Sequence, residues 1–380
     1  TAEGSNPEGA SGQGTGTSDD DGLDLDELSV RQKAQLDKAI KDQQAMMDGE
    51  TKKGKLSKKE ASAVNSLDEA GVDSKEVEYN SNNWHGKYEK KKQNVVIVRN
   101  FSRRVADAVE CGMWSTSSWN IKRNNKSIMD GIRYGIMLGK KLKVRQEERS
   151  LKFNRLNAGK IDKRMIASAG YGTENIFEKI ESFSYKPSII HLSIDSSGSM
   201  SGSKFEKSLT TAAAIAKACS MIEHMDCVIS FRSGSWINNS NMPIIVVAYD
   251  SRKHSISQLT SNLEPMHASG GTPEGLCFDA IMNEVLNSSR GKDAYFVNFS
   301  DGEPCYESYS GADAYQHTKQ QVNKMKFNGI KVISYFISEY HYESSRKAFN
   351  TMYGKDASFI DVNQINSVAK SMNDKFLEIA

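Results

Sequence analysis

Oxygen-bearing side chains directly follow an apolar run in the stretch "IIHLSIDSSGSMSG", residues 189–202. The run 189–194 is typical of a buried strand, and Asp195, Ser197 and Ser199 alternate along the loop after it. Open α/β sheets place their ligand sites at the carboxyl ends of such strands. Carboxylate and hydroxyl oxygens in that position indicate a site for a hard cation, although this stretch alone could also cap a helix that begins near Ser203.

Two later stretches complete the pattern. "ASGGTPEG" (268–275) places Thr272 in a glycine loop just before a predicted helix, and "YFVNFSDGEP" (295–304) places Asp301 at the end of another apolar strand. Mg²⁺ prefers near-octahedral oxygen ligands at ~2.1 Å and keeps several waters. We therefore predict that Mg²⁺ or Mn²⁺ is bound by Asp195, Ser197, Ser199, Thr272 and Asp301, with room for one carboxylate from outside the chain.

Strands and helices alternate from about residue 185, which is typical of a mostly parallel sheet with helices on both faces. The predicted strands are 189–194, 226–231, 243–249, 294–299, 331–337 and 358–361. Helices are predicted after the first loop and at 274–287, 314–328, 344–352 and about 364–379. The connection 232–242 is too short for a crossover helix, so its two strands should form an antiparallel pair.

These patterns predict three parts. Residues 1–28 are rich in glycine, serine and acidic residues and should form a disordered tail. Residues 29–184 should be mainly helical, with capping boxes at 29–32 and 57–60, helices at 101–111 and 127–147, and a single strand at 94–98. Residues 185–380 should form the α/β domain, a doubly wound, mostly parallel six-stranded sheet.

Residues 87–160 are basic, with 19 Lys and Arg against 6 Asp and Glu, an excess of 13 positive charges. Such a surface suits nucleic acid or an acidic protein, or it is a solvated helical face that meets the chain's own acidic tail. No zinc-finger or RNA-recognition signature favours nucleic acid. We expect a solvated face or a protein partner, with Lys140 and Lys141 as contact residues in the second case.

Composition excludes several classes. No apolar run approaches the ~20 residues of a membrane span, and the acidic N-terminus is unlike a signal peptide. Five scattered cysteines without zinc-site spacing predict free thiols and a cytoplasmic protein, with Cys219 and Cys227 in the core. The chain has no GxxxxGK[ST] motif and no paired base for a serine nucleophile, so we expect no catalysis by the chain alone.

Two residues near the predicted site leave alternatives open. His267, five residues before Thr272, either approaches the metal loop or is a solvated loop histidine. For Trp236, in the connection 232–242, the sequence favours neither an exposed aromatic anchor nor a packing residue.

Asp-x-Ser-x-Ser, a loop threonine and a strand-end aspartate, in this order, resemble the metal-ion-dependent adhesion site of von Willebrand factor A domains. This resemblance implies a Rossmann-like fold and binding of a partner's carboxylate through the metal.

A second resemblance covers about residues 130–380. "GKKLKVRQEERSLKFNRLNAGKIDKRMI" (139–166) resembles the segment ahead of the A domain in the CobT subunit of aerobic cobaltochelatase, and "SDGEP" (300–304) and the ending "DVNQINSVAKSMNDKFLEIA" are also similar. The resemblance implies an accessory subunit that partners a ring-forming AAA+ ATPase of the MoxR/CobS type and passes its motion to a protein target. The alternative is a stand-alone A-type binding or scaffold module without an ATPase.

Overall fold

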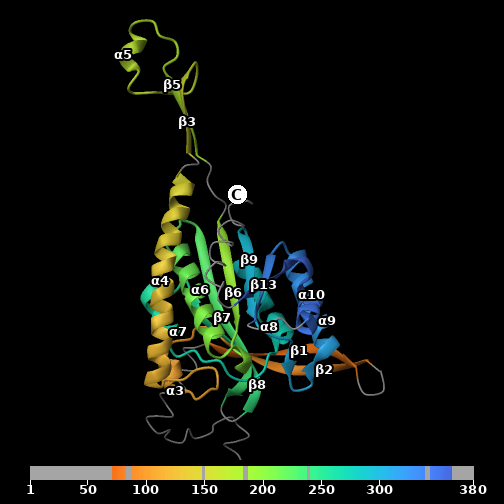
Figure 1. Ribbon diagram of the computed structural model, residues 1–380. Helices are drawn as coiled ribbons and strands as arrows, with labels where there is room; N and C mark the ends of the chain where they lie inside the picture. The colour runs from red at the N-terminus through yellow and green to blue at the C-terminus, as the bar shows by residue number, and fades with distance from the viewer. Residues whose placement is uncertain are drawn as a thin grey trace, which may run out of the picture. The chain divides into compact units, whose positions relative to one another are not determined.

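Figure 1 shows the computed structural model, which describes residues 71–82, 88–147, 150–182, 187–237, 240–338 and 343–361. All of them belong to one compact unit, Lys58–Ala380. The predicted tail, both capping boxes and the helix expected at 364–379 lie outside the described residues.

An eight-stranded sheet forms the centre of this unit, with the order β1-β2-β8-β7-β6-β9-β12-β13 (Figure 1). Its strands are β1 (Val72–Asn82), β2 (Tyr88–Val98), β6 (Ser188–Asp195), β7 (Met225–Ile237), β8 (Ser240–Asp250), β9 (Asp293–Ser300), β12 (Lys331–Ser338) and β13 (Ala357–Asp361). Neighbours are parallel except in the pairs β1–β2 and β7–β8. This confirms the prediction of a mostly parallel α/β sheet and of its antiparallel pair.

The sheet has eight strands rather than six because a hairpin from the preceding region joins it. β2 pairs in parallel with β8, with Val96–Val98 opposite Ile244–Val246. The predicted strand at 94–98 is therefore not isolated, and the boundary expected before residue 185 does not separate the sheet from what precedes it. β1 was missed because its inward residues Val77 and Tyr79 alternate with polar residues in a mostly polar stretch.

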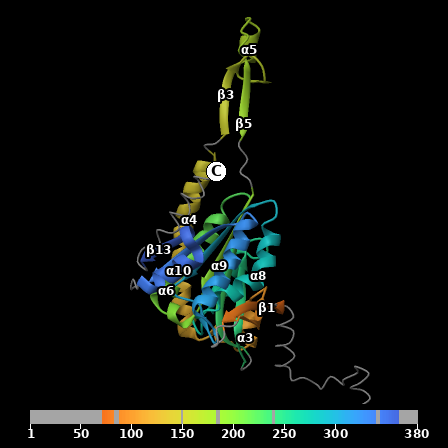
Figure 2. The ribbon, with the colours of Figure 1, turned by 90° about the vertical axis from the view of Figure 1, so that its right-hand side faces the viewer.

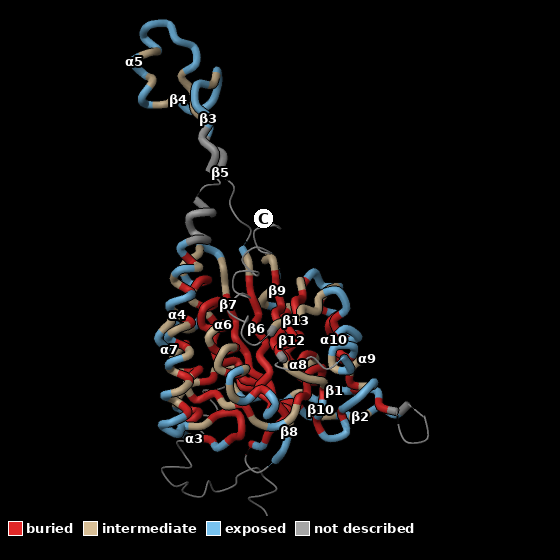
Figure 3. The backbone as a smooth tube through the Cα atoms, viewed as in Figure 1, coloured by how far each residue is buried: buried red, intermediate tan, exposed pale blue. Residues whose placement is uncertain are grey.

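Helices cover both faces of the sheet (Figures 1 and 2). One face carries α4 (Ser118–Glu147), α6 (Ser203–Cys219) and α7 (Ile256–Leu263); the other carries α8 (Glu274–Ser288), α9 (Gly311–Phe327) and α10 (Glu343–Tyr353). Buried residues concentrate in the strands and in the inward sides of the helices (Figure 3). This double layer makes the sheet doubly wound.

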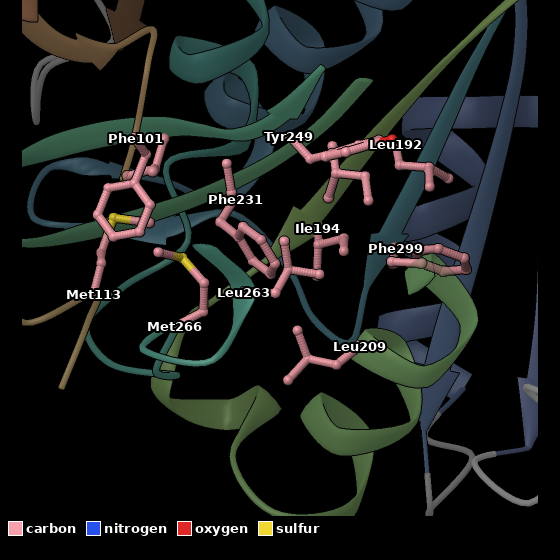
Figure 4. Close-up of a cluster of buried hydrophobic side chains, with 14 of the residues drawn as sticks. Phe101, Met113, Leu192, Ile194, Leu209, Phe231, Tyr249, Leu263, Met266 and Phe299 are labelled. Atoms are coloured by element: carbon pink, nitrogen blue, oxygen red, sulfur yellow. The ribbon is translucent and has the colours of Figure 1, made fainter. Parts of the chain in front are cut away.

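Neighbouring residues of β6 point into different cores because side chains alternate along a strand. Ile190, Leu192 and Ile194 pack on the α6 side, in the cluster that Figure 4 shows. Ile189 packs on the opposite side with Phe278 of α8. The continuous apolar run 189–194 thus reflects burial on both faces.

The close contact between α4 and α6 depends on three glycines of α4. A Cβ at Gly131 would lie 2.3 Å from the carbonyl oxygen of Thr210, and one at Gly135 would lie 2.5 Å from that of Ala214. At Gly139 it would meet Met221 Sδ at 2.8 Å. The helix predicted at 127–147 exists, begins nine residues earlier at Ser118, and uses its glycine line to approach α6.

Among the described residues, the region before residue 185 is less helical than expected. Its described part contains α3 (Arg103–Ala108), α4, the four-residue α5 (Ile166–Ala169), the hairpin, and a small antiparallel sheet of β3 (Ser150–Leu156), β5 (Phe177–Ser182) and β4 (Lys160–Ile161). The helix expected over 101–111 ends early because Val109 is extended. Shorter elements elsewhere are β10 (Cys305–Tyr306), β11 (Tyr309–Ser310) and 3₁₀ turns at Gly198–Met200 and Gly354–Asp356.

Candidate metal centre

The two predicted carboxylates lie at the ends of neighbouring strands. Asp195 is the last residue of β6, and Asp301 directly follows Ser300, the last residue of β9. Because β6 and β9 are parallel, their carboxyl ends meet at the same edge of the sheet. Ser300 Oγ donates to Asp195 Oδ2 at 3.1 Å, so the two strand ends are connected directly.

The two loop serines connect the carboxylates to each other. The backbone N–H of Ser197 donates to Asp195 Oδ1 at 2.9 Å, and the hydroxyl oxygens of Ser197 and Ser199 lie 3.0 Å apart. Ser199 Oγ donates to Asp301 Oδ1 at 2.8 Å. The structure therefore brings four of the five predicted residues into one hydrogen-bonded cluster.

The loop that carries Thr272 is fixed between the other two loops. Gly198 N–H donates to the Gly270 carbonyl at 2.9 Å, and Thr272 exchanges backbone hydrogen bonds of 2.9 and 3.0 Å with Cys305. Thr272 itself is buried. Gly270 has φ +85°, and a Cβ there would lie 2.0 Å from the Gly234 carbonyl oxygen, so only glycine fits this approach.

Burial dominates the electrostatics of the cluster. Asp195 is fully buried, and the side chain of Asp301 is 1% exposed. Loss of hydration raises the pKa of Asp195 to about 6; the charge of Arg232 opposes this rise and the charge of Asp301 adds to it. A carboxylate in this position is stabilised as an anion by any additional cation nearby.

Lys204, in the first turn of α6, supplies one cation. Its Nζ lies 2.5 Å from Asp301 Oδ2 and donates to the Ser199 carbonyl at 3.1 Å. Lys204 was not among the predicted site residues. A basic residue five positions after Ser199, at the start of the following helix, was the available signal.

A buried ion pair lies next to the carboxylate of Asp195. Arg232 Nη2 donates to Glu274 Oε1 at 2.6 Å and lies 4.0 Å from Asp195 Oδ2. Arg232 is 1% exposed and Glu274 is completely buried, and Asn298 Nδ2 also donates to Glu274, at 2.9 Å. These residues too were missed, although an arginine that ends the apolar run "VISF" is an unusual charge for a strand.

The donor set fits a hard divalent ion. It combines two buried carboxylates with the hydroxyls of Ser197 and Ser199, and Thr272 on the adjoining loop offers a third hydroxyl. This low charge count leaves coordination positions for water or an outside carboxylate. Burial raises the pKa of Asp195 despite the nearby charge of Arg232. Among the described residues no group of three or more His, Cys, Asp and Glu could hold a metal, so this site depends on its hydroxyls.

The remaining predicted residues lie away from this cluster or outside the description. Lys140 is exposed on α4, and the side chain of Lys141 is not among those described. All five cysteines are unpaired, with Cys219 and Cys227 buried as expected. Within the described segments, none of the helices has the length and apolarity that a membrane span requires.

Comparison with known proteins gives structural likeness only. No family model and no curated protein matches the sequence. Solved structures with von Willebrand factor A domains are similar to it. The vWF domain of the type V pili tip protein Mfa5 from Porphyromonas gingivalis is 9% identical, with a TM-score of 0.40 over 51% of this chain and 97% of that one.

Two further structures are similar over about half of this chain. The pilus adhesin SpaC from Lactobacillus rhamnosus GG is 14% identical, with a TM-score of 0.39 over 51% of this chain and 30% of SpaC. Manganese-loaded TRAP from Plasmodium vivax is 12% identical, with a TM-score of 0.32 over 49% of this chain and 73% of that one. This chain thus spans less than a third of SpaC.

Proposed function

We propose that this chain is a metal-dependent protein-binding module of the von Willebrand factor A type. The observation that carries the proposal is the cluster of oxygen donors, joined by hydrogen bonds, around the buried carboxylates of Asp195 and Asp301. Bound Mg²⁺ or Mn²⁺ would supply a Lewis-acidic position for an Asp or Glu carboxylate of a partner. Ser197, Ser199 and Thr272 would add ligands without adding charge.

We further propose that the module is a cytoplasmic accessory subunit of a MoxR/CobS-type AAA+ ATPase. The resemblance at 139–166 supports this proposal, and so does the basic surface of α4, where Lys122, Lys126, Arg133 and Lys140 are exposed. These side chains lie opposite the glycines that approach α6. Lys140 and Lys141 would make a second, salt-sensitive contact with the partner.

Co-purification with the AAA+ protein tests this function. Wild type should bind the ring in Mg²⁺ and lose it in EDTA, and Asp301→Ala and Thr272→Ala should weaken the complex much more than the fold. Asp356→Ala is the matched control, because Asp356 pairs with Lys326 just before β13, at the end of the sheet away from the metal loops. A complex that survives both EDTA and Asp301→Ala unchanged removes the metal from the interface.

The stand-alone module differs in its dependence on the ATPase. It would bind a carboxylate-bearing protein in Mg²⁺ whether or not an AAA+ ring and ATP are present. Pull-down with and without ATP therefore separates the two. Charge reversal at Lys140 should reduce the association rate with the ring, and it should leave binding by a stand-alone module unchanged.

A further inference from the structure

A cavity adjoins the candidate metal centre, with a volume of about 500 Å³. One wall is formed by the end of α3 and the connection to α4, from Ala106 to Thr116, and the other by Trp236, His267 and Ser269. The backbone of the α3–α4 connection runs beside both partners: Gly112 N–H donates to the Trp236 carbonyl at 3.0 Å, and His267 N–H donates to the Met113 carbonyl at 2.8 Å. The region before the α/β domain thus builds half of this cavity.

The cavity and the metal loops share their backbone. Ser269 N–H donates to the Ser196 carbonyl at 2.8 Å, and Ser196 lies between the two ligand candidates Asp195 and Ser197. The hydroxyl of Ser196 donates to the His267 carbonyl at 2.7 Å. The cavity therefore lies beside the loop of the candidate ligands Asp195 and Ser197, within reach of a short peptide that places a carboxylate on the metal.

The charged residues that line the cavity are acidic. Asp107 and Glu110 contribute carboxylates, and no Lys or Arg is among the lining residues that the structure describes. Asp107 is paired with Arg103, but the exposed Glu110 has no ion pair with the described residues. Arg123, the cation whose charge acts on His267, is paired with Glu206 and stacked on Trp119.

Two groups in the cavity suit a planar cation. Trp236 is 43% exposed, so its indole is available for stacking. Burial and the charge of Arg123 lower the pKa of His267, which disfavours a positive charge on this ring beside the cavity. Guanidinium combines a flat face with several N–H donors, whereas ammonium is a compact point charge.

We propose that this cavity binds an arginine side chain of the same partner segment whose carboxylate completes the metal centre. The proposal rests on the proposed function and specifies its partner: a segment with an arginine a few residues from an Asp or Glu. Glu110 would pair with the guanidinium, and Trp236 would stack on it.

Blocked peptides that carry Arg and Asp, separated by two to five glycines, test this with the full chain labelled with 5-fluorotryptophan. In Mg²⁺ the best peptide should shift the Trp236 resonance, which Trp236→Phe identifies. Citrulline in place of Arg keeps the shape without the charge and should weaken binding about tenfold. Glu110→Gln should remove most of that difference, and Glu343→Gln, an exposed carboxylate on α10, should not.

The outcomes separate the two proposals. If the citrulline peptide binds as tightly as the arginine peptide, and both need Mg²⁺ and the Asp, the arginine cavity is wrong and the carboxylate contact stands. If no peptide of the series binds more tightly in Mg²⁺ than in EDTA, the carboxylate contact fails and the cavity proposal fails with it.

Discussion

Lys204 Nζ lies 2.5 Å from Asp301 Oδ2 and also donates to the carbonyl of Ser199. A fixed positive charge is thus placed against one of the two carboxylates on which the candidate metal centre depends. The ammonium compensates the charge of Asp301, and it would have to share or release that carboxylate if a divalent ion bound there. Lys204 and a metal would therefore compete for Asp301.

Replacement of this ammonium should increase affinity for the metal. Lys204→Met keeps much of the apolar stem and removes the charge, so we expect Mg²⁺ to bind on the order of tenfold more tightly, equivalent to about 1.4 kcal/mol. The same variant should be less stable than wild type in EDTA. Calorimetric titration with MgCl₂ measures the first effect, with Lys207→Met on the same helix as control. An affinity equal to or below that of wild type contradicts the competition.

Metal binding should stabilise the folded chain. A ligand at roughly 100 times its dissociation constant adds about 2.7 kcal/mol to the free energy of unfolding, so saturating Mg²⁺ should raise the Tm of wild type. Asp195→Ala and Asp301→Asn should melt at the same temperature in Mg²⁺ and in EDTA. Asp293→Asn, at the other end of β9, should respond like wild type. If neither Mg²⁺ nor Mn²⁺ changes the Tm of wild type, the proposed metal site is wrong.

The pair of Arg232 and Glu274 should be intolerant of single substitution. Arg232→Met leaves Glu274 and Asp195 buried without their counter-charge, which should cost about 3–5 kcal/mol of stability. Arg232→Met combined with Glu274→Leu removes both charges and should recover part of this loss. Urea denaturation of the single and double variants measures it. Additive losses in the double variant would show that the two charges do not compensate each other.

His191 should make stability depend on pH. Burial, with help from the charge of Arg252, lowers its pKa to about 4, below the 6.5 of the ordinary side chain. The folded state therefore binds fewer protons between these values, so the contribution is complete above pH 6.5 and is lost as the pH falls toward 4.

Between about pH 7 and about pH 4.5 wild type should lose about 2 to 3 kcal/mol more than His191→Phe. Ser288, which bonds His191 Nε2 at 3.0 Å, also donates to backbone carbonyls of its own helix and keeps those bonds in the variant. Urea denaturation in EDTA at both pH values excludes any contribution from metal. Equal losses in the two proteins would show that His191 does not set this dependence.

The three glycines of α4 that approach α6 should not tolerate a larger side chain. Alanine normally favours a helix over glycine by about 1 kcal/mol, but a Cβ at Gly135 meets the backbone oxygen of Ala214 at 2.5 Å. We expect Gly135→Ala to destabilise by about 1–3 kcal/mol, because α4 must move away from α6. Ser127→Ala on the same helix reports the propensity gain alone. A stabilised Gly135→Ala would mean that the two helices separate at little cost.

The α/β core and the loops that carry the five candidate metal ligands could be predicted from the sequence because each signal is local. Apolar runs ended by Asp195 and Asp301 indicate both the strands and the positions of their ends. The residues that contact the candidate ligands could not be predicted from such local patterns. Lys204 and Arg232 reach their partners only through tertiary contacts, and sequence spacing says nothing about which carboxylate a cation meets.

The strands before residue 185 show the same limit. β1 has few apolar residues, and β2 finds its partner β8 roughly 150 residues further along the chain. The helix α7 was missed although its start carries a capping box of Ser255 and Gln258, because its eight residues are too few for a clear period. Short or non-local elements give too little local pattern to be recognised.

The hairpin β1–β2 has a consequence for how the protein is made. During synthesis the hairpin leaves the ribosome well before β8. Until β8 is made, inward residues such as Val95 and Ile97 remain exposed to solvent because the core that buries them has not formed. A fragment that begins at Pro187 would have the opposite defect, since β8 would offer unpaired backbone groups to any other chain. Exposed apolar residues and unpaired strand edges, which promote aggregation, are therefore removed only when both the β1–β2 hairpin and β8 are present.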